Sequence, residues 1–149
     1  MVVMAFPAGS TVTYGLQTLG NSSASDSIEL LTVSPVMGDP PPEARGEVKL
    51  LGPERVATLG AGAFDVVPGW PPSGTDPIDV TGQRVPAGTS SHVEVVLPVA
   101  VPPRGMAVIE GFDVEYRVDG RRYQERSSIT LVLCPSEYPQ DCAEFEQGL

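Results

Sequence analysis

The sequence predicts an all-β protein, an antiparallel β-sandwich of about seven to eight short strands. Apolar and polar residues alternate with a period of two along residues 93–101 and 106–118. This pattern is typical of strands with one buried and one solvated face. An Asp119-Gly120 pair then separates two such runs and favours a two-residue hairpin turn. Turn signals divide the other short apolar runs, none of which has a convincing helical period.

The first half of the chain contains four shorter strand candidates. We expect residues 1–9 to form a flexible arm and residues 10–134 to form the sandwich. Strands are predicted at residues 11–16 and at residues 27–34, where Ile28, Thr32 and Val33 are β-branched. The proline triplet at residues 40–42 cannot pair in a central strand. Two further candidates follow at residues 47–51 and 55–59.

Residues 60–89 are rich in glycine, proline, aspartate and serine. A structureless stretch of this length is uncommon within a compact domain. The region is therefore either a functional loop or the site of hidden short strands, for which residues 64–67 and 78–80 are the candidates. The strong strands follow, and residues 135–149 form a C-terminal tail.

The Asp119-Gly120 turn also predicts the register of the last hairpin. It pairs Tyr116 with Tyr123, and Asp113 with Arg126 as opposite charges on the solvated face. The same register extends to two further apolar pairs, Val108 with Leu131 and Met106 with Leu133.

Two features disagree with this register. Glu125 and Ser127 fall on the apolar parity, and a β-bulge near Gly111 or Ser127 would account for them. Arg117 also faces Arg122, which places two like charges opposite each other. Exposure to solvent is the only explanation that the sequence suggests for this pair.

The composition restricts the partners of the protein. The 149 residues fit one domain and include 9 basic and 19 acidic residues, for a net charge of −10. Nucleic acid and polybasic membrane contacts are not expected, because both need clustered basic side chains. No apolar run reaches the ~20 residues of a membrane-spanning helix. Contact with a membrane is therefore expected only through a segment absent from this chain.

The two cysteines, Cys134 and Cys142, lie close together at the end of the sandwich and in the tail. A loop that leaves the last strand at Cys134 can return and form a disulfide with Cys142. A disulfide implies an oxidising compartment, and hence an extracytoplasmic location. The alternative is two unrelated thiols in a cytosolic protein. A zinc site is not expected, because no histidine lies near this pair.

No catalytic constellation is visible. The single histidine, His92, lies at a strand start on the solvated parity, and no activated serine motif occurs. We therefore expect a protein that is not an enzyme, with no catalytic residues, cofactor or metal. Asp65, Asp76 and Asp79 lie in the long loop region without the spacing of a calcium loop, so solvated carboxylates are expected there.

Trp70 is the candidate contact residue of the long loop region. Prolines at positions 68, 71 and 72 flank it, so its indole either forms a stacking surface for a partner or covers the open end of the sandwich. We predict a contact surface around Trp70 with Asp76 and Asp79. An exposed sheet edge that accepts a strand is the other candidate surface.

Two parts of the sequence resemble a known class of domain. Residues 105–123 (GMAVIEGFDVEYRVDGRRY) and 131–134 (LVLC) resemble the closing hairpin of immunoglobulin-like domains in actinobacterial envelope proteins. Residues 15–21 and 28–33 are similar to the first strand pair of those domains. The resemblance implies an immunoglobulin-like sandwich that is secreted or tethered to a bacterial membrane, and it supplies no catalytic or binding residues.

These inferences together favour a non-catalytic extracytoplasmic interaction or accessory module of a bacterial envelope or secreted protein. Its expected partner is a protein or another component of the cell envelope. One alternative is a self-assembling structural protein of a surface layer, appendage or virion, which the mass in solution would test. The other is a carboxylate- or metal-dependent hydrolase, which requires Asp65, Asp76 and Asp79 to converge.

Overall fold

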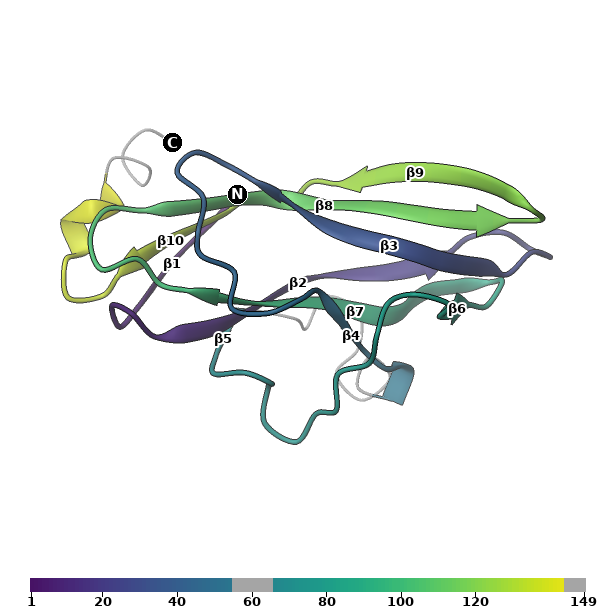
Figure 1. Ribbon diagram of the computed structural model, residues 1–149, viewed down its shortest axis with the longest axis horizontal. Helices are drawn as coiled ribbons and strands as arrows, with labels where there is room; N and C mark the ends of the chain where they lie inside the picture. Colours follow the sequence, from purple (N-terminus) through teal and green to yellow (C-terminus); the bar gives the residue numbers. More distant parts are fainter. Residues whose placement is uncertain (55–65, 144–149) are drawn as a thin grey trace.

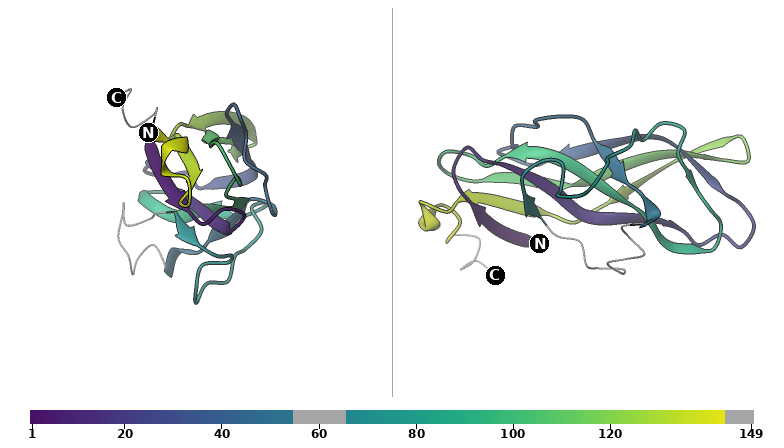
Figure 2. Two further views of the ribbon diagram at one scale, coloured as in Figure 1. Left: turned by 90° about the vertical axis from the view of Figure 1, so that its left-hand side faces the viewer. Right: turned by 90° about the horizontal axis from the view of Figure 1, so that it is seen from below.

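The computed structural model describes residues 1–54 and 66–143, which form two facing β-sheets (Figures 1 and 2). The strands of the described residues are β1 (Val2–Phe6), β2 (Thr11–Asn21), β3 (Ile28–Met37), β4 (Lys49–Leu51), β5 (Val67–Pro68), β6 (Arg84–Val85), β7 (Thr89–Ala100), β8 (Ala107–Val118), β9 (Arg121–Ser127) and β10 (Leu131–Pro135). A 3₁₀ turn, η1, follows at Pro139–Asp141. The larger sheet has the order β1-β10-β8-β3-β6, with β9 also paired to β8, and the smaller has the order β4-β7-β2-β5.

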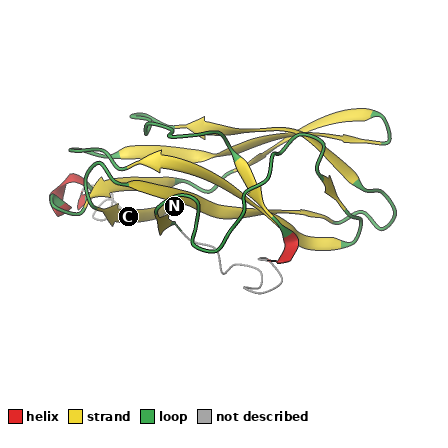
Figure 3. Ribbon diagram, turned by 60° about the horizontal axis from the view of Figure 1, so that its bottom comes forward, coloured by secondary structure: helices red, strands yellow, loops and turns green. Residues whose placement is uncertain are grey.

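The predicted all-β fold of two packed sheets is confirmed, and strands dominate the view in Figure 3. Inward-facing side chains from both sheets form one core. The rings of Tyr14 on β2 and Phe112 on β8 stack across it with centroids 5.2 Å apart. The Tyr14 hydroxyl donates a 2.7 Å hydrogen bond to the carbonyl of Ile129. The most deeply buried core residues include Val12, Tyr14, Leu30, Leu50, Val95, Leu97, Val99, Ile109, Phe112, Leu131 and Leu133.

The prediction that one face of β7 is solvated is wrong for two residues. Glu94 and Pro98 are buried, as is every other residue from position 93 to position 101. Gly46 lies so close to the outer face of β7 that a Cβ atom there would be 2.9 Å from Cγ of Pro98. The sequence period identifies the core face of a strand, but not the loops that cover its other face.

The structure differs most clearly from the sequence prediction at residues 1–9. Residues 1–9 were expected to be a flexible arm, whereas Val2–Phe6 form β1 and pair in parallel with β10, from Val2–Leu131 to Phe6–Pro135. Val2, Met4 and Phe6 pack against the core. The apolar segment thereby covers the outer edge of β10. The other strand pairs of the described residues are antiparallel.

The β8–β9 hairpin has the predicted register as far as the bulge. Tyr116 pairs with Tyr123 and Asp113 with Arg126. Beyond the bulge the prediction is wrong by one residue, because Leu131 pairs with Ile109 rather than Val108.

Gly111 explains the shift. Its φ is +142°, and a Cβ atom on it would lie 1.9 Å from the carbonyl oxygen of Ser127. Only glycine fits this conformation and this close approach. A register shift is therefore present beside Gly111, and residues 128–130 separate β9 from β10. The shift follows Ser127, so it does not account for Glu125 and Ser127, which stay on the apolar parity, paired with Val114 and Phe112.

The long region after β4 contributes little regular structure. Ile78 forms an isolated bridge with Leu50, and β6 was not predicted. The strand candidate at residues 55–59 lies outside the described residues, as do Asp65 and part of the candidate at 64–67.

The C-terminal tail is fastened to the larger sheet. The predicted disulfide joins Cys134 to Cys142, with 5.8 Å between their Cα atoms, and both residues are buried beside Val108 and Val132. The carboxylate of Asp141 accepts hydrogen bonds from Nε of Arg104 at 3.1 Å and from the Gly105 amide at 2.7 Å. These bonds hold the pKa of Asp141 below its usual value, with the Arg104 guanidinium as the largest cause.

Candidate functional site

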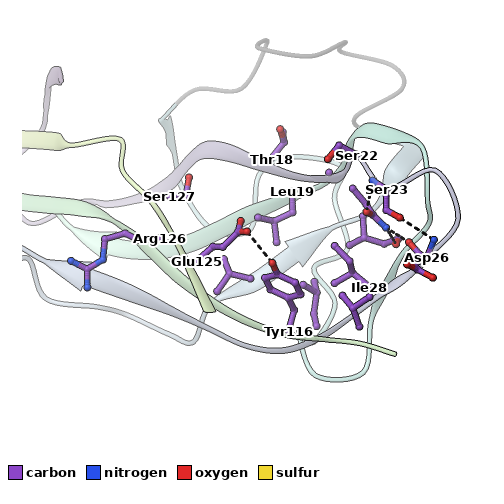
Figure 4. Close-up of a pocket in the computed structure, with 16 residues that line it drawn as sticks. Thr18, Leu19, Ser22, Ser23, Asp26, Ile28, Tyr116, Glu125, Arg126 and Ser127 are labelled. Carbon is purple, nitrogen blue, oxygen red and sulfur yellow. Dashed lines mark hydrogen bonds between the residues drawn. The ribbon is translucent and has the colours of Figure 1, made fainter. Parts of the chain in front are cut away.

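A groove lies at the end of the sandwich where the β8–β9 hairpin extends beside β2 (Figure 4). We call it the β9 groove, and its volume is about 590 Å³. Its floor is apolar and comes from both sheets: Leu19, Ile28, Leu30, Val85, Val114, Tyr116 and Val118. Its rim is polar: Thr18, Gly20, Asn21, Ser22, Ser23, Asp26, Glu125, Arg126 and Ser127. An apolar floor with a polar rim is the usual composition of a binding site.

The loop that closes one end of the groove is held by Asn21. Nδ2 of this buried amide donates hydrogen bonds to the carbonyl oxygens of Asp26 at 2.6 Å and Val85 at 3.2 Å. Its Oδ1 accepts one from the Ser23 amide at 3.1 Å. These bonds tie the β2–β3 connection to β6, so this wall of the groove has a fixed position.

The other wall is β9, whose inward face carries polar and aromatic side chains. Glu125 lies opposite Val114 in the ladder and points toward the groove (Figure 4). Its Oε1 accepts a 2.9 Å hydrogen bond from the hydroxyl of Tyr116. Burial, and to a smaller extent Glu125, raise the pKa of Tyr116 to about 12. The ring of Tyr116 in turn stacks with that of Tyr123, at 5.5 Å between centroids.

The two faces of β9 differ in how their charges are paired. On the outer face, Arg126 forms two hydrogen bonds with Asp113, at 2.8 and 3.0 Å, and Arg122 lies 3.4 Å from Glu115. On the inner face, Arg121 and Glu125 form no ion pair with the described residues.

The sequence suggested only solvent exposure to explain why Arg117 and Arg122 face each other, and the structure supplies a second explanation. Arg117 lies 3.4 Å from Glu29 on β3, and Arg122 lies 3.4 Å from Glu115. Each guanidinium is therefore beside its own carboxylate.

The outer edge of β9 carries main-chain groups with no strand partner in the described part of the chain. Asp119 and Gly120 have φ of +50° and +77°, as a two-residue hairpin turn requires. In such a hairpin the hydrogen-bonded pairs alternate from the turn, so Arg122, Gln124 and Arg126 direct their N–H and C=O groups away from β8. β1 covers the neighbouring edge of β10 but not that of β9 (Figure 1).

The contact residues predicted from the sequence lie elsewhere. Trp70 is partly exposed after β5, and Asp76 and Asp79 are exposed. None of the three lines the β9 groove. Asp79 forms an ion pair with Lys49, and Asp65 lies outside the described residues. No group of three potential metal ligands is found among residues 1–54 and 66–143.

The sequence contained one indication of the groove. Glu125 and Ser127 break the apolar alternation, and both line the site. Their side chains share the face of Val114 and Phe112 because they are paired with these residues. Polar residues on a core parity indicate that the opposing sheet does not cover that part of the strand.

Comparisons with known proteins add no assignment: no protein-family model matches the chain, and no curated protein is significantly similar to it. Among the described residues, no helix is long and apolar enough to cross a membrane.

Proposed function

We propose that the protein is a non-catalytic, extracytoplasmic interaction module of a bacterial envelope or secreted protein, and that it binds a partner protein at β9. In this proposal the fold is an immunoglobulin-like sandwich, as the resemblance of its closing hairpin implies. The Cys134–Cys142 disulfide supports an oxidising compartment.

The open edge of β9 beside the β9 groove is the observation that carries the proposal. Strand addition uses main-chain hydrogen bonds for affinity and adjacent pockets for specificity. The outward-facing groups of Arg122, Gln124 and Arg126 would supply the hydrogen bonds. The groove floor would receive alternate side chains of the added strand.

The test is capture of a partner by the edge of β9. Gln124→Pro removes an outward amide and obstructs the edge, whereas Gln124→Ala keeps the amide and serves as the matched control. Both variants retain the β8 ladder, because Gln124 bonds outward. The folded domain is cross-linked in an envelope extract of its host, and captured proteins are identified by mass spectrometry.

We expect one dominant partner that the wild type and Gln124→Ala capture and that Gln124→Pro loses. Equal capture by all three proteins would refute β9 as the binding surface. A Trp70→Ala variant that alone loses the partner would instead assign binding to the loop after β5.

A further inference from the structure

We propose that the protein which adds its strand to β9 is a second copy of this chain, bound antiparallel about a two-fold axis at Tyr123. The inference rests on the proposed function and names its partner. Two β9 strands would then join the larger sheets of both copies into one continuous sheet.

The charge pattern of β9 is self-complementary in this arrangement. With the two Tyr123 residues opposite each other, Arg121 lies opposite Glu125 of the second copy. The two-fold axis repeats this pair, so the dimer gains two ion pairs. Both residues are exposed, and neither has an ion-pair partner among the described residues of its own chain. Charges normally protect an edge strand from association, but here opposite charges face each other.

The main-chain geometry permits the same register. Arg122 and Gln124 both direct their amide and carbonyl groups outward. In the proposed register Arg122 lies opposite Gln124 of the second copy, so the two residues form a hydrogen-bonded pair. A shift by one residue would place a residue whose main-chain groups point away from β8 opposite one whose main-chain groups are already bonded to β8. The ladder between the two copies could then not form.

The other allowed registers oppose like charges. A two-fold axis at Gln124 places Arg122 opposite Arg126 of the second copy. An axis at Arg122 or at Glu125 places two copies of the same charged residue opposite each other. Like charges directly opposite one another are destabilising. The register at Tyr123 avoids these contacts and pairs Arg121 with Glu125.

The side chain at the axis also favours association. Tyr123 is 45% exposed, and it is among the large apolar side chains most open to solvent. In the dimer it packs against Tyr123 of the second copy, while each ring keeps its stack on Tyr116 of its own chain. The inner faces of both sheets lie on the same side, so the two β9 grooves become neighbours.

The experiment is a charge exchange read by sedimentation velocity over a wide range of protein concentration. Arg121→Glu opposes two carboxylates, and Glu125→Arg opposes two guanidinium groups, so each variant alone is expected to be monomeric. An equimolar mixture of the two restores both ion pairs and is expected to form a heterodimer. Arg45→Glu makes the same charge change at an exposed position in the loop beside β7, away from β9, and is the matched control that stays dimeric.

The outcomes separate this inference from the proposed function. Circular dichroism first establishes that each variant is folded. The inference is supported if wild type and Arg45→Glu are dimeric, each single β9 variant is monomeric, and the mixture of the two β9 variants is dimeric. A wild-type dimer that the single variants do not disturb overturns it, because the interface then lies elsewhere. A monomeric wild type also overturns it, but the proposed function stands if Gln124→Pro still abolishes capture of another protein.

Discussion

Tyr116 donates its hydroxyl hydrogen to Glu125 across the β8–β9 hairpin, at 2.9 Å. The phenol is half-buried in the β9 groove, whereas the carboxylate extends over it from an exposed strand (Figure 4). This hydrogen bond exists only while the Tyr116 hydroxyl keeps its proton, because a phenolate would place a second negative charge beside the carboxylate of Glu125.

The first prediction follows from this pair. The pKa of Tyr116 is raised from 10.0 to about 12, so the folded state holds this proton more tightly than the unfolded state. The stability from Tyr116 is complete below pH 10 and is lost as the pH rises through 12. Glu125→Gln is expected to lower this pKa, because the negative charge is removed. Tyrosinate absorbance measured against a Tyr116→Phe reference gives the value, and a wild-type transition near the unperturbed pKa would contradict the prediction.

The second prediction concerns the bulge at Gly111. Gly111→Ala must place a Cβ atom 1.9 Å from the carbonyl oxygen of Ser127, and we expect a loss of more than about 2 kcal/mol in the free energy of unfolding. Gly105→Ala is the control, since Gly105 also has a positive φ but has open space around it. Its expected loss is about 1 kcal/mol. Equal losses in urea denaturation would show that the close approach to Ser127 is not important.

The third prediction concerns the disulfide. Cys134 and Cys142 close a short loop with a sequence separation of 8, and constraint of the unfolded chain by such a loop contributes about 2.5 kcal/mol. Urea denaturation of the oxidised and reduced protein is expected to differ by this amount. A Cys134→Ala/Cys142→Ala variant, which has no disulfide, should not respond to reductant. Identical curves for oxidised and reduced wild type would exclude a stabilising role.

The fourth prediction concerns Gln17 in the core. Its Nε2 donates a 3.3 Å hydrogen bond to the hydroxyl of Tyr14, but its buried Oε1 has no partner in the described structure. Because an unsatisfied buried acceptor is costly, Gln17→Leu is expected to raise the free energy of unfolding by about 1 kcal/mol.

Tyr14→Phe is the contrasting variant for this prediction. It loses the hydrogen bond to Ile129 and is expected to lower the free energy of unfolding by a similar amount. A clear loss of stability in Gln17→Leu would show that Oε1 is satisfied in solution.

Local signals in the sequence were sufficient for part of the fold. The Asp119-Gly120 dipeptide determines its own turn and therefore the pairing of Tyr116 with Tyr123, because the geometry of a two-residue turn extends directly into its strands. The alternation along β7 and β8 identified core residues such as Val95 and Phe112 for the same reason, since a side chain's face depends only on its parity.

Pairings between distant segments could not be predicted in this way. Nothing in residues 1–9 specifies that Val2 lies beside Leu131, because the partner of an edge strand depends on which other edges remain open. The candidate site depends on the same kind of information. Glu125 and Ser127 break the apolar alternation of the sequence. The groove beside them, however, is also lined by β2 and by the loop after Asn21, and the sequence does not show where these segments lie.

The pairing of β1 with β10 has a consequence for how the protein reaches its native state. Val2 and Leu131 are neighbours in space but are far apart in the sequence. The ribosome must synthesise residues 131–135 before β1 can pair with them, and until then Val2, Met4 and Phe6 lack their native contacts. Because such distant contacts form slowly, we expect the closure of this sheet to be a late and slow step, and the period before it to be when the chain is most prone to aggregate.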